Sequence, residues 1–352
     1  MKLLSKIIGI SLIAVSVNSF ASMQQCAESA ASGNAKDAIQ NCKPYANNNI
    51  KAAGIVGGAY AATKEYDKSV PYLQKYIAYY KNDSTADKLT LAGAYTALGN
   101  MYYFGQISKD TTKGLEYITK GAELGNPIAQ KQLGDIYAAK KVMPQNIPLS
   151  YEWYTIATVN GDQDALRSSV MQNLATFQKQ YPYCIALGQD NVAQAYYQGI
   201  GGLDQSTSTA VTWLEKAQET DPSLSIVNLD LAKMQHNNGD DDAAFKAANA
   251  AVSQPYAPAF QYLGAMYLEG TGTSKDLVKA YAYLKVVEYY YNNPDKAFWE
   301  KFKAPCRPNY EQIPSGFGLD VLNQEMGKID LNAGQKVEAD KMVGEIKMKV
   351  EK

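Results

Sequence analysis

The chain has 352 residues, and its 34 basic residues nearly balance its 35 acidic residues, which gives a formal net charge of -1. A chain so close to neutral lacks the basic surface that electrostatic binding of nucleic acid requires, so we expect no nucleic-acid partner. Beyond residue 21 no stretch stays apolar over the roughly 20 residues needed to cross a bilayer, and we expect no membrane span in the mature chain.

Residues 1–21 have the pattern of a secretory signal peptide. Lys2 and Lys6 make the start positive, residues 7–17 form an apolar run, and a small-x-small motif ends at Ala21. An uncleaved anchor is the alternative, but the apolar run is too short to span a bilayer. The pattern predicts cleavage after Ala21 and a periplasmic or secreted protein.

Residues 22–50 predict an N-terminal helical hairpin whose turn lies near Asn34. Cys26 stands eight residues before Asn34 and Cys42 eight residues after it, so the two face each other on antiparallel helices. An even number of cysteines in an exported chain favours disulfides, although four cysteines allow three connectivities. We expect a Cys26–Cys42 bond.

A repeated pattern occupies residues 51–292. Its best copies begin at Leu98 and Leu263, and they share Leu-Gly, a tyrosine three residues later, a glycine three further on, and then Ser-Lys-Asp. Looser copies begin near residues 54, 133, 193 and 225. Extra chain lies between the copies at 133 and 193, and it predicts an additional helix near residues 163–180.

Each copy predicts a helix, a loop with glycine or asparagine and a second helix, and little in the sequence favours strands. Gly264 is expected to let the two helices approach closely, and Asp276 or Ser274 to cap the second helix. We expect Gly272 to lie in an exposed loop. These predictions give an all-α fold of stacked helical hairpins.

The loop glycines have an alternative interpretation as a phosphate-binding loop. That motif needs GxxxxGK[ST] or GxGxxG directly after a strand. Here Gly270 and Gly272 follow a helix, and Lys275 has no glycine before it. The helical turn is therefore the favoured interpretation.

Residues 293–352 predict an irregular segment followed by one or two amphipathic capping helices. If Cys26 pairs with Cys42, then Cys184 and Cys306 remain as a second pair, although 122 residues separate them. In a plain solenoid each repeat contacts only its neighbours, so this bond requires the chain after Asn293 to turn back along the repeats. Two unpaired buried cysteines are the alternative.

No constellation of residues indicates catalysis or metal binding. His236 is the single histidine, which excludes paired-histidine metal motifs, and neither CxxC nor GxSxG occurs. His236 is expected at the end of a helix, where it stabilises the C-terminus. Asp240, Asp241 and Asp242 lack the spacing of a calcium loop and are expected at a helix start. The sequence therefore predicts no catalytic, cofactor-binding or metal-binding residue.

The 27 tyrosines are the outstanding feature of the composition. Most are expected to pack between helices, but exposed tyrosines are good interface residues because they bury a large area with few rotatable bonds. Pure packing and stacking against a glycan are the alternatives. Three tyrosines are candidates for the concave face of the repeats: Tyr95, Tyr103 and Tyr197.

The copy at Leu263 carries the clearest signature of a known family. Its matching residues are Leu263, Gly264, Tyr267, Gly270, Gly272, Asp276, Lys279, Ala280 and Tyr283. This pattern resembles the Sel1-like repeat, a relative of the tetratricopeptide repeat, over roughly residues 50–290.

The resemblance implies an α/α solenoid with a C-terminal helical cap, which binds partners and has no chemistry or cofactor of its own. Exported bacterial members suggest roles in the envelope or with a host. Some secreted relatives carry a cysteine pair in each repeat and bind β-lactams, but the cysteines here lie outside the repeat frame. The expected function is an exported, non-enzymatic scaffold for a protein or peptide partner; a cell-wall-associated glycan-binding or enzyme-modulating protein is the alternative.

Overall fold

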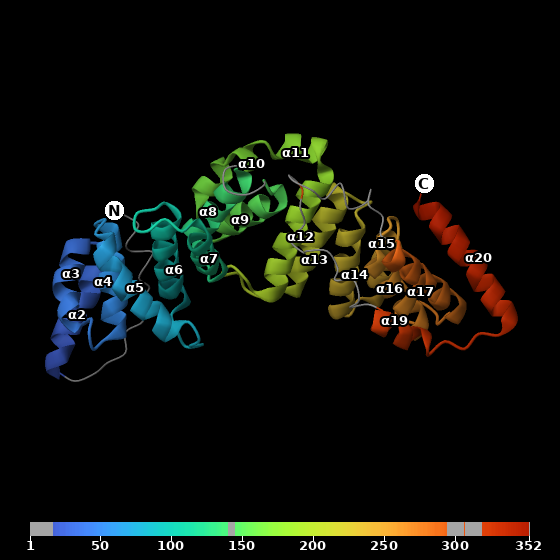
Figure 1. Ribbon diagram of the computed structural model, residues 1–352, viewed down its shortest axis with the longest axis horizontal. Coiled ribbons are helices and arrows are strands. Elements are labelled where there is room, and N and C mark those ends of the chain that lie inside the picture. The colour runs from blue at the N-terminus through green and yellow to red at the C-terminus, as the bar shows by residue number, and fades with distance from the viewer. Residues whose placement is uncertain (1–16, 140–144, 294–305, 307–318, 352) are drawn as a thin grey trace. The chain divides into compact units, whose positions relative to one another are not determined.

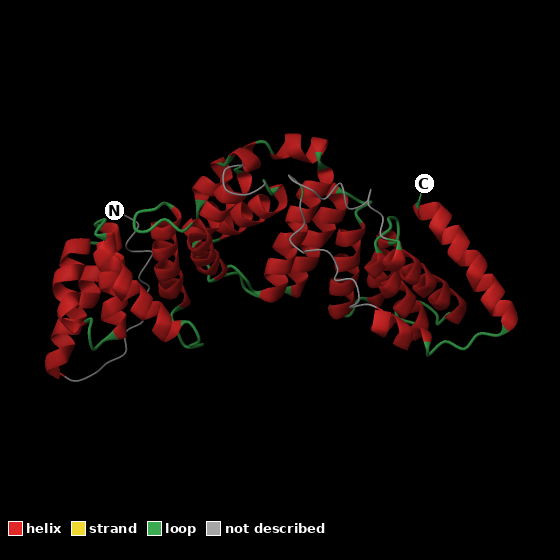
Figure 2. Ribbon diagram, in the orientation of Figure 1, coloured by secondary structure: helices red, strands yellow, loops and turns green. Residues whose placement is uncertain are grey.

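A computed structural model describes residues 17–139, 145–293, 306 and 319–351 of the chain. Within these residues all regular elements are helices and no strand forms (Figures 1 and 2). The expected all-α fold of helix-turn-helix repeats is confirmed. The elements are α2 (Val17–Ala31), α3 (Ala35–Cys42), η1 (Lys43–Tyr45), α4 (Ile50–Ala62), α5 (Tyr66–Tyr80), α6 (Lys88–Tyr103), α7 (Thr111–Glu123), α8 (Pro127–Ala138), α9 (Ile147–Val159), η2 (Gln163–Arg167), α10 (Ser169–Gln172), α11 (Leu174–Gln180), α12 (Pro182–Gln198), α13 (Thr207–Thr220), α14 (Ser225–Asn237), α15 (Asp241–Ala251), α16 (Ala257–Glu269), α17 (Leu277–Asn292), α19 (Leu319–Met326) and α20 (Ala333–Val350).

The described chain divides into two compact units. The first unit contains the described residues up to Leu133, together with Trp153–Ala165 and Ile200–Leu203. The second unit contains the described residues of Gly134–Glu152, Leu166–Gly199 and Asp204–Lys352. Each unit has its own core of buried apolar side chains.

The repeat glycines lie where two helices of a hairpin nearly touch. In the first unit, a Cβ atom on Gly114 of α7 would lie 2.5 Å from the main-chain nitrogen of Tyr103 on α6. In the second unit, a Cβ atom on Gly264 of α16 would lie 3.1 Å from Leu284 Cγ on α17. The expected close approach at Gly264 is confirmed, and it explains why the repeat uses residues without side chains here.

The second helix of a repeat begins at the aspartate of the Ser-Lys-Asp motif. Asp276 caps α17 by accepting a hydrogen bond from Lys279 N at 3.0 Å, and Asp110 caps α7 by accepting one from Lys113 N at 3.0 Å. The cap is therefore Asp276 and not Ser274. Gly270 ends α16 with a φ of +82°, a conformation that glycine adopts without a steric cost.

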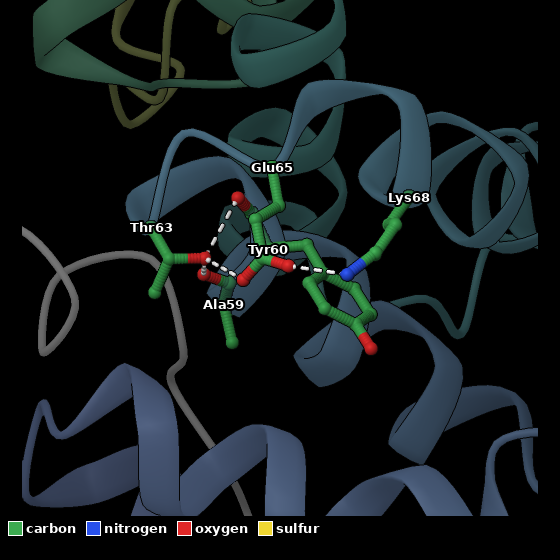
Figure 3. A network of polar contacts seen from close by, with 5 residues as sticks. All are labelled: Ala59, Tyr60, Thr63, Glu65 and Lys68. Carbon is green, nitrogen blue, oxygen red and sulfur yellow. Dashed lines mark hydrogen bonds and ion pairs between the residues drawn. The ribbon is translucent and has the colours of Figure 1, made fainter.

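The first repeat hairpin, α4–α5, makes its turn without a glycine. Lys64 has a φ of +63°, and no other non-glycine residue among those described has a positive φ. A polar network stabilises this turn (Figure 3): Thr63 Oγ1 lies 3.2 Å from Ala59 O and 3.0 Å from Glu65 Oε1, and Glu65 Oε2 pairs with Lys68 Nζ at 2.7 Å. The hydrogen bond from Lys68 lowers the pKa of the exposed Glu65 carboxyl. Local polar contacts here take the place of the turn glycine that follows α6, α12, α14 and α16.

One loop glycine differs from the sequence-based prediction. Gly272 has a φ of +63°, and its α-carbon faces the start of α15 instead of open solvent. A Cβ atom there would collide with the main-chain carbonyl of Asp241 and lie 2.8 Å from Phe245 Cβ. The expectation of an exposed loop was wrong because the α16–α17 loop packs on the preceding repeat.

Both disulfides join the cysteine pairs expected from the sequence. Cys26 of α2 and Cys42 of α3 are fully buried, with their Cα atoms 4.8 Å apart. Cys184 of α12 is bonded to Cys306, with a Cα–Cα distance of 4.9 Å, so the chain after α17 returns to α12. The rest of the predicted irregular segment, apart from Asn293 and Cys306, lies outside the described residues.

Two groups of helices lie outside the repeat hairpins. η2, α10 and α11 fill the interval in which an extra helix was predicted, although η2 falls largely in the first unit. At the C-terminal end α20 packs on α17, where Ala339 and Leu331 are buried against Ala282. Asn332 and Gln335 form a reciprocal capping box at the start of α20.

The predicted signal peptide falls mostly outside the described residues. The first described helix, α2, begins at Val17 and continues past Ala21, the expected cleavage point. Among the described helices, none combines the length and the apolar character required to cross a membrane.

Candidate functional site

A cavity of about 210 Å³ opens in the first unit between the helices of consecutive repeats. Helices α4, α5 and α6 supply most of its surface, and residues after α6 and around the start of α8 complete it. The lining residues are Gly54, Gly58, Ala61, Ala62, Tyr66, Leu73, Tyr76, Thr90, Gly93, Ala94, Thr96, Ala97, Asn100, Met101, Gln106, Asn126 and Ile128.

Small residues on two helices create the space. Gly54, Gly58 and Ala62 follow one another at intervals of four on α4, and Gly93 and Ala97 do the same on α6. Residues four apart lie on the same face of a helix, so each helix presents a face nearly without side chains. The four-residue spacing of these small residues is visible in the sequence.

Tyr76 forms one wall of the cavity. Its ring packs so closely on α4 that a Cβ atom on Gly54 would lie 2.5 Å from Tyr76 Cδ2. The Tyr76 side chain is 3 % exposed, and burial raises the pKa of its hydroxyl, which is hydrogen-bonded to Thr90. Leu73 and Met101, both fully buried, add apolar surface beside it.

The polar groups of the cavity are uncharged. Thr96 donates to Ala92 O at 2.7 Å, and Asn126 Oδ1 accepts from Ala129 N at 3.0 Å. Asn100 Oδ1 differs from these, because it is buried and has no hydrogen-bond partner. The cavity therefore combines apolar walls with a few uncharged polar side chains.

Four segments of the chain match the Sel1 repeat family model: residues 92–126, 127–162, 186–217 and 261–285. They coincide with the hairpins α6–α7, α8–α9, α12–α13 and α16–α17. These four segments of the chain are therefore Sel1 repeats. The hairpins α4–α5 and α14–α15 are outside the matched segments. Comparison of the sequence with curated proteins gives no match.

Two solved structures are similar to this chain. A Sel1 repeat protein from Oxalobacter formigenes is 17% identical, with a TM-score of 0.32 over 80% of this chain and 98% of its own. A protective antigen present in uropathogenic Escherichia coli strains, which displays an SLR fold, is 16% identical, with a TM-score of 0.28 over 95% of both chains. At these scores the two likenesses carry no argument about function.

The tyrosines predicted for a partner groove do not line the cavity of the first unit. Tyr95 is only 7 % exposed and packs on Tyr117 with 5.8 Å between ring centroids, so it is a core residue and not a groove residue. Tyr103 is half-buried near the end of α6. Tyr197 belongs to the second unit, where it is half-buried and its hydroxyl accepts from Asn237 Nδ2 at 3.0 Å. Tyr95 and Tyr103 both lie on α6, and Tyr197 lies on α12.

His236 and the three adjacent aspartates serve helix ends, as the sequence predicted. His236 Nδ1 lies 2.5 Å from Asp241 Oδ1 on the surface between α14 and α15, and Asp240 caps α15 through Ala243 N at 3.0 Å. Among the described residues, no group of three or more histidine, cysteine, aspartate or glutamate side chains is placed to hold a metal ion.

A buried carboxyl in the second unit was not predicted from the sequence. Glu152 of α9 is 6 % exposed, and its Oε2 atom has no hydrogen-bond partner. The pKa of Glu152 is raised to about 8: burial is the main cause, the Asn191 hydrogen bond opposes the rise, and the nearby Asp190 carboxylate adds to it. Glu152 is therefore mostly protonated at neutral pH. No motif indicated this, because its burial depends on α12 packing beside it.

Proposed function

We propose that the protein is an exported, non-enzymatic scaffold that binds another protein in the bacterial envelope or on a host. The observation that carries this proposal is the uncharged cavity in the first unit, which is built from the helices of consecutive repeats. Sel1 repeats generally mediate protein interactions, so a hollow between repeats is where a partner is expected. A cavity with apolar walls and a few polar groups is also the usual form of a binding site.

The side chains most suited to catalysis are engaged elsewhere, which supports a role without chemistry. All four cysteines are bonded, so no thiol is available as a nucleophile. His236 pairs with Asp241 at a helix junction on the surface of the second unit, whereas the cavity belongs to the first unit.

Export is supported by the signal-like residues 1–21 and by two disulfides, which persist in oxidising compartments. N-terminal sequencing of the mature protein tests it. We expect the mature chain to begin at Ser22 or within a few residues of it. Recovery of the full-length chain from the cytoplasm would contradict export.

Affinity capture tests the binding function. Mature protein is immobilised, crosslinked in envelope extract and analysed for bound polypeptides, and in parallel it is titrated with muropeptides and chitooligosaccharides. The proposal predicts a saturable polypeptide partner and no saturable glycan binding. Glycan binding without a polypeptide partner would favour the cell-wall alternative.

A further inference from the structure

We propose that Asn238, in the exposed turn between α14 and α15, is a site of spontaneous deamidation, whereas the fold protects Asn160 from the same reaction. This inference does not depend on the proposed function. It follows from the different contacts of the two Asn-Gly pairs that the sequence contains, Asn238-Gly239 and Asn160-Gly161.

An asparagine that precedes glycine can be converted to an acid by water alone. The main-chain nitrogen of the glycine attacks the asparagine Cγ atom and forms a bond to it, while the bond between Cγ and Nδ2 breaks. The proton of the attacking N–H leaves with Nδ2 as ammonia, and a cyclic imide remains. Water then opens the imide at either carbonyl carbon, which gives aspartate or isoaspartate and adds one negative charge. Glycine favours the attack because no side chain crowds its nitrogen or restricts its φ and ψ angles.

The main chain is alike in the two turns. Each asparagine directly follows the end of a helix, α14 or α9, and the glycines have φ angles of +85° at Gly239 and +94° at Gly161. The nitrogen of Gly239 donates to His236 O at 2.9 Å. The nitrogen of Gly161 donates to Thr158 O at 3.0 Å. Each turn must therefore open by breaking one similar hydrogen bond, and this step does not favour either site.

The two asparagine side chains differ. Asn160 is half-buried, and its Nδ2 atom donates to Gln130 Oε1 at 2.9 Å and to Gly201 O at 2.6 Å. Asn238 is exposed, and within the described part of the chain its side-chain amide makes no hydrogen bond. Since Cγ must swing onto the next nitrogen and Nδ2 must leave, Asn160 has to break both bonds first. One such bond slows the reaction about fivefold and two slow it about thirtyfold.

Deamidation would have different consequences at the two sites. At Asn238 the new carboxylate joins the exposed residues Asp240, Asp241 and Asp242, so the turn becomes more acidic while no side-chain hydrogen bond is lost. At Asn160 a carboxylate oxygen would replace the donor that holds Gly201 O. The contacts that protect Asn160 are therefore the ones that its deamidation would destroy.

Incubation of the mature, disulfide-bonded protein at mildly alkaline pH tests the proposal. Peptides are mapped by mass spectrometry at intervals, with aspartate and isoaspartate products separated by chromatography. We expect the peptide with position 238 to accumulate both products and the peptide with position 160 to convert about thirtyfold more slowly. Equal rates at the two positions, or no conversion at position 238, would overturn the proposal.

The same protein, reduced and unfolded in urea, is the control for the effect of the fold. Without the contacts of Asn160 the two positions should convert at similar rates, and a persistently slow Asn160 would show that the fold does not protect it. Asn238→Gln should also prevent the early acidic species that ion-exchange chromatography separates from the folded protein. Unchanged accumulation of that species in Asn238→Gln would be the contrary result.

Discussion

Replacement of Glu152 by glutamine removes a proton-binding group from the interior of the second unit while it preserves the shape of the side chain. The carboxyl is 6 % exposed on α9, and one of its oxygens has no hydrogen-bond partner. Burial is the main reason that its pKa rises from 4.5 to about 8, and the Asp190 carboxylate adds to the rise. Glutamine resembles the protonated acid, so we expect the variant to fold.

The raised pKa determines the sign of the pH dependence. Between pH 4.5 and about 8 the folded chain keeps the Glu152 proton, whereas the unfolded chain has released it. Folding then binds a proton, so the stability due to this group is fully present below pH 4.5 and is lost as the pH rises to about 8. The expected slope is about 1.4 kcal/mol per pH unit, or about 5 kcal/mol across the whole window.

Urea unfolding followed by circular dichroism at several pH values measures this effect. We compare the unmodified protein with Glu152→Gln, and with Glu219→Gln as a matched control on an exposed glutamate of α13. As the pH rises, the free energy of unfolding of the unmodified protein should fall steadily relative to that of Glu152→Gln. Relative to Glu219→Gln it should show no such trend. A difference that is constant from pH 5 to 8 would refute a buried, protonated Glu152.

The remaining predictions concern stability and use the same unfolding assay. Gly264→Leu should lose about 1–3 kcal/mol, because its side chain would enter the contact between α16 and α17, and a neutral result would contradict that contact. Gly272→Val should lose at least as much, because a positive φ and a carbonyl collision both oppose it; a smaller loss would place the loop in open solvent. Lys64→Gly should gain about 1 kcal/mol by relieving a left-handed backbone at an exposed site, and a loss would mean that the polar turn depends on lysine. Replacement of both Cys26 and Cys42 by serine should lower the free energy of unfolding by about 3 kcal/mol, and no change in stability would argue against the bond.

Local features of the fold were predictable from the sequence. The cap at Asp276, the close packing at Gly264 and the bond between Cys26 and Cys42 each depend on residues within one hairpin. In such cases the helical period alone decides which side chains meet. The family signature then extends this local pattern to the other hairpins.

Features that depend on contacts between hairpins were not predictable in this way. Gly272 packs on the preceding repeat, and Glu152 becomes buried only when α12 covers it. Neither of these contacts has a fixed sequence spacing. The cavity is a partial exception, since the small residues four apart on α4, such as Gly54 and Gly58, were visible in the sequence.

Site-specific photocrosslinking tests most directly whether the first unit holds a polypeptide. A photoreactive phenylalanine is placed at Ala62, an exposed residue that lines the cavity, and separately at Lys246, an exposed residue of α15 in the second unit. In envelope extract, illumination should give one discrete protein adduct from position 62 and none from position 246. Equal adducts from both positions, or adducts with glycan alone from position 62, would contradict a polypeptide-binding cavity.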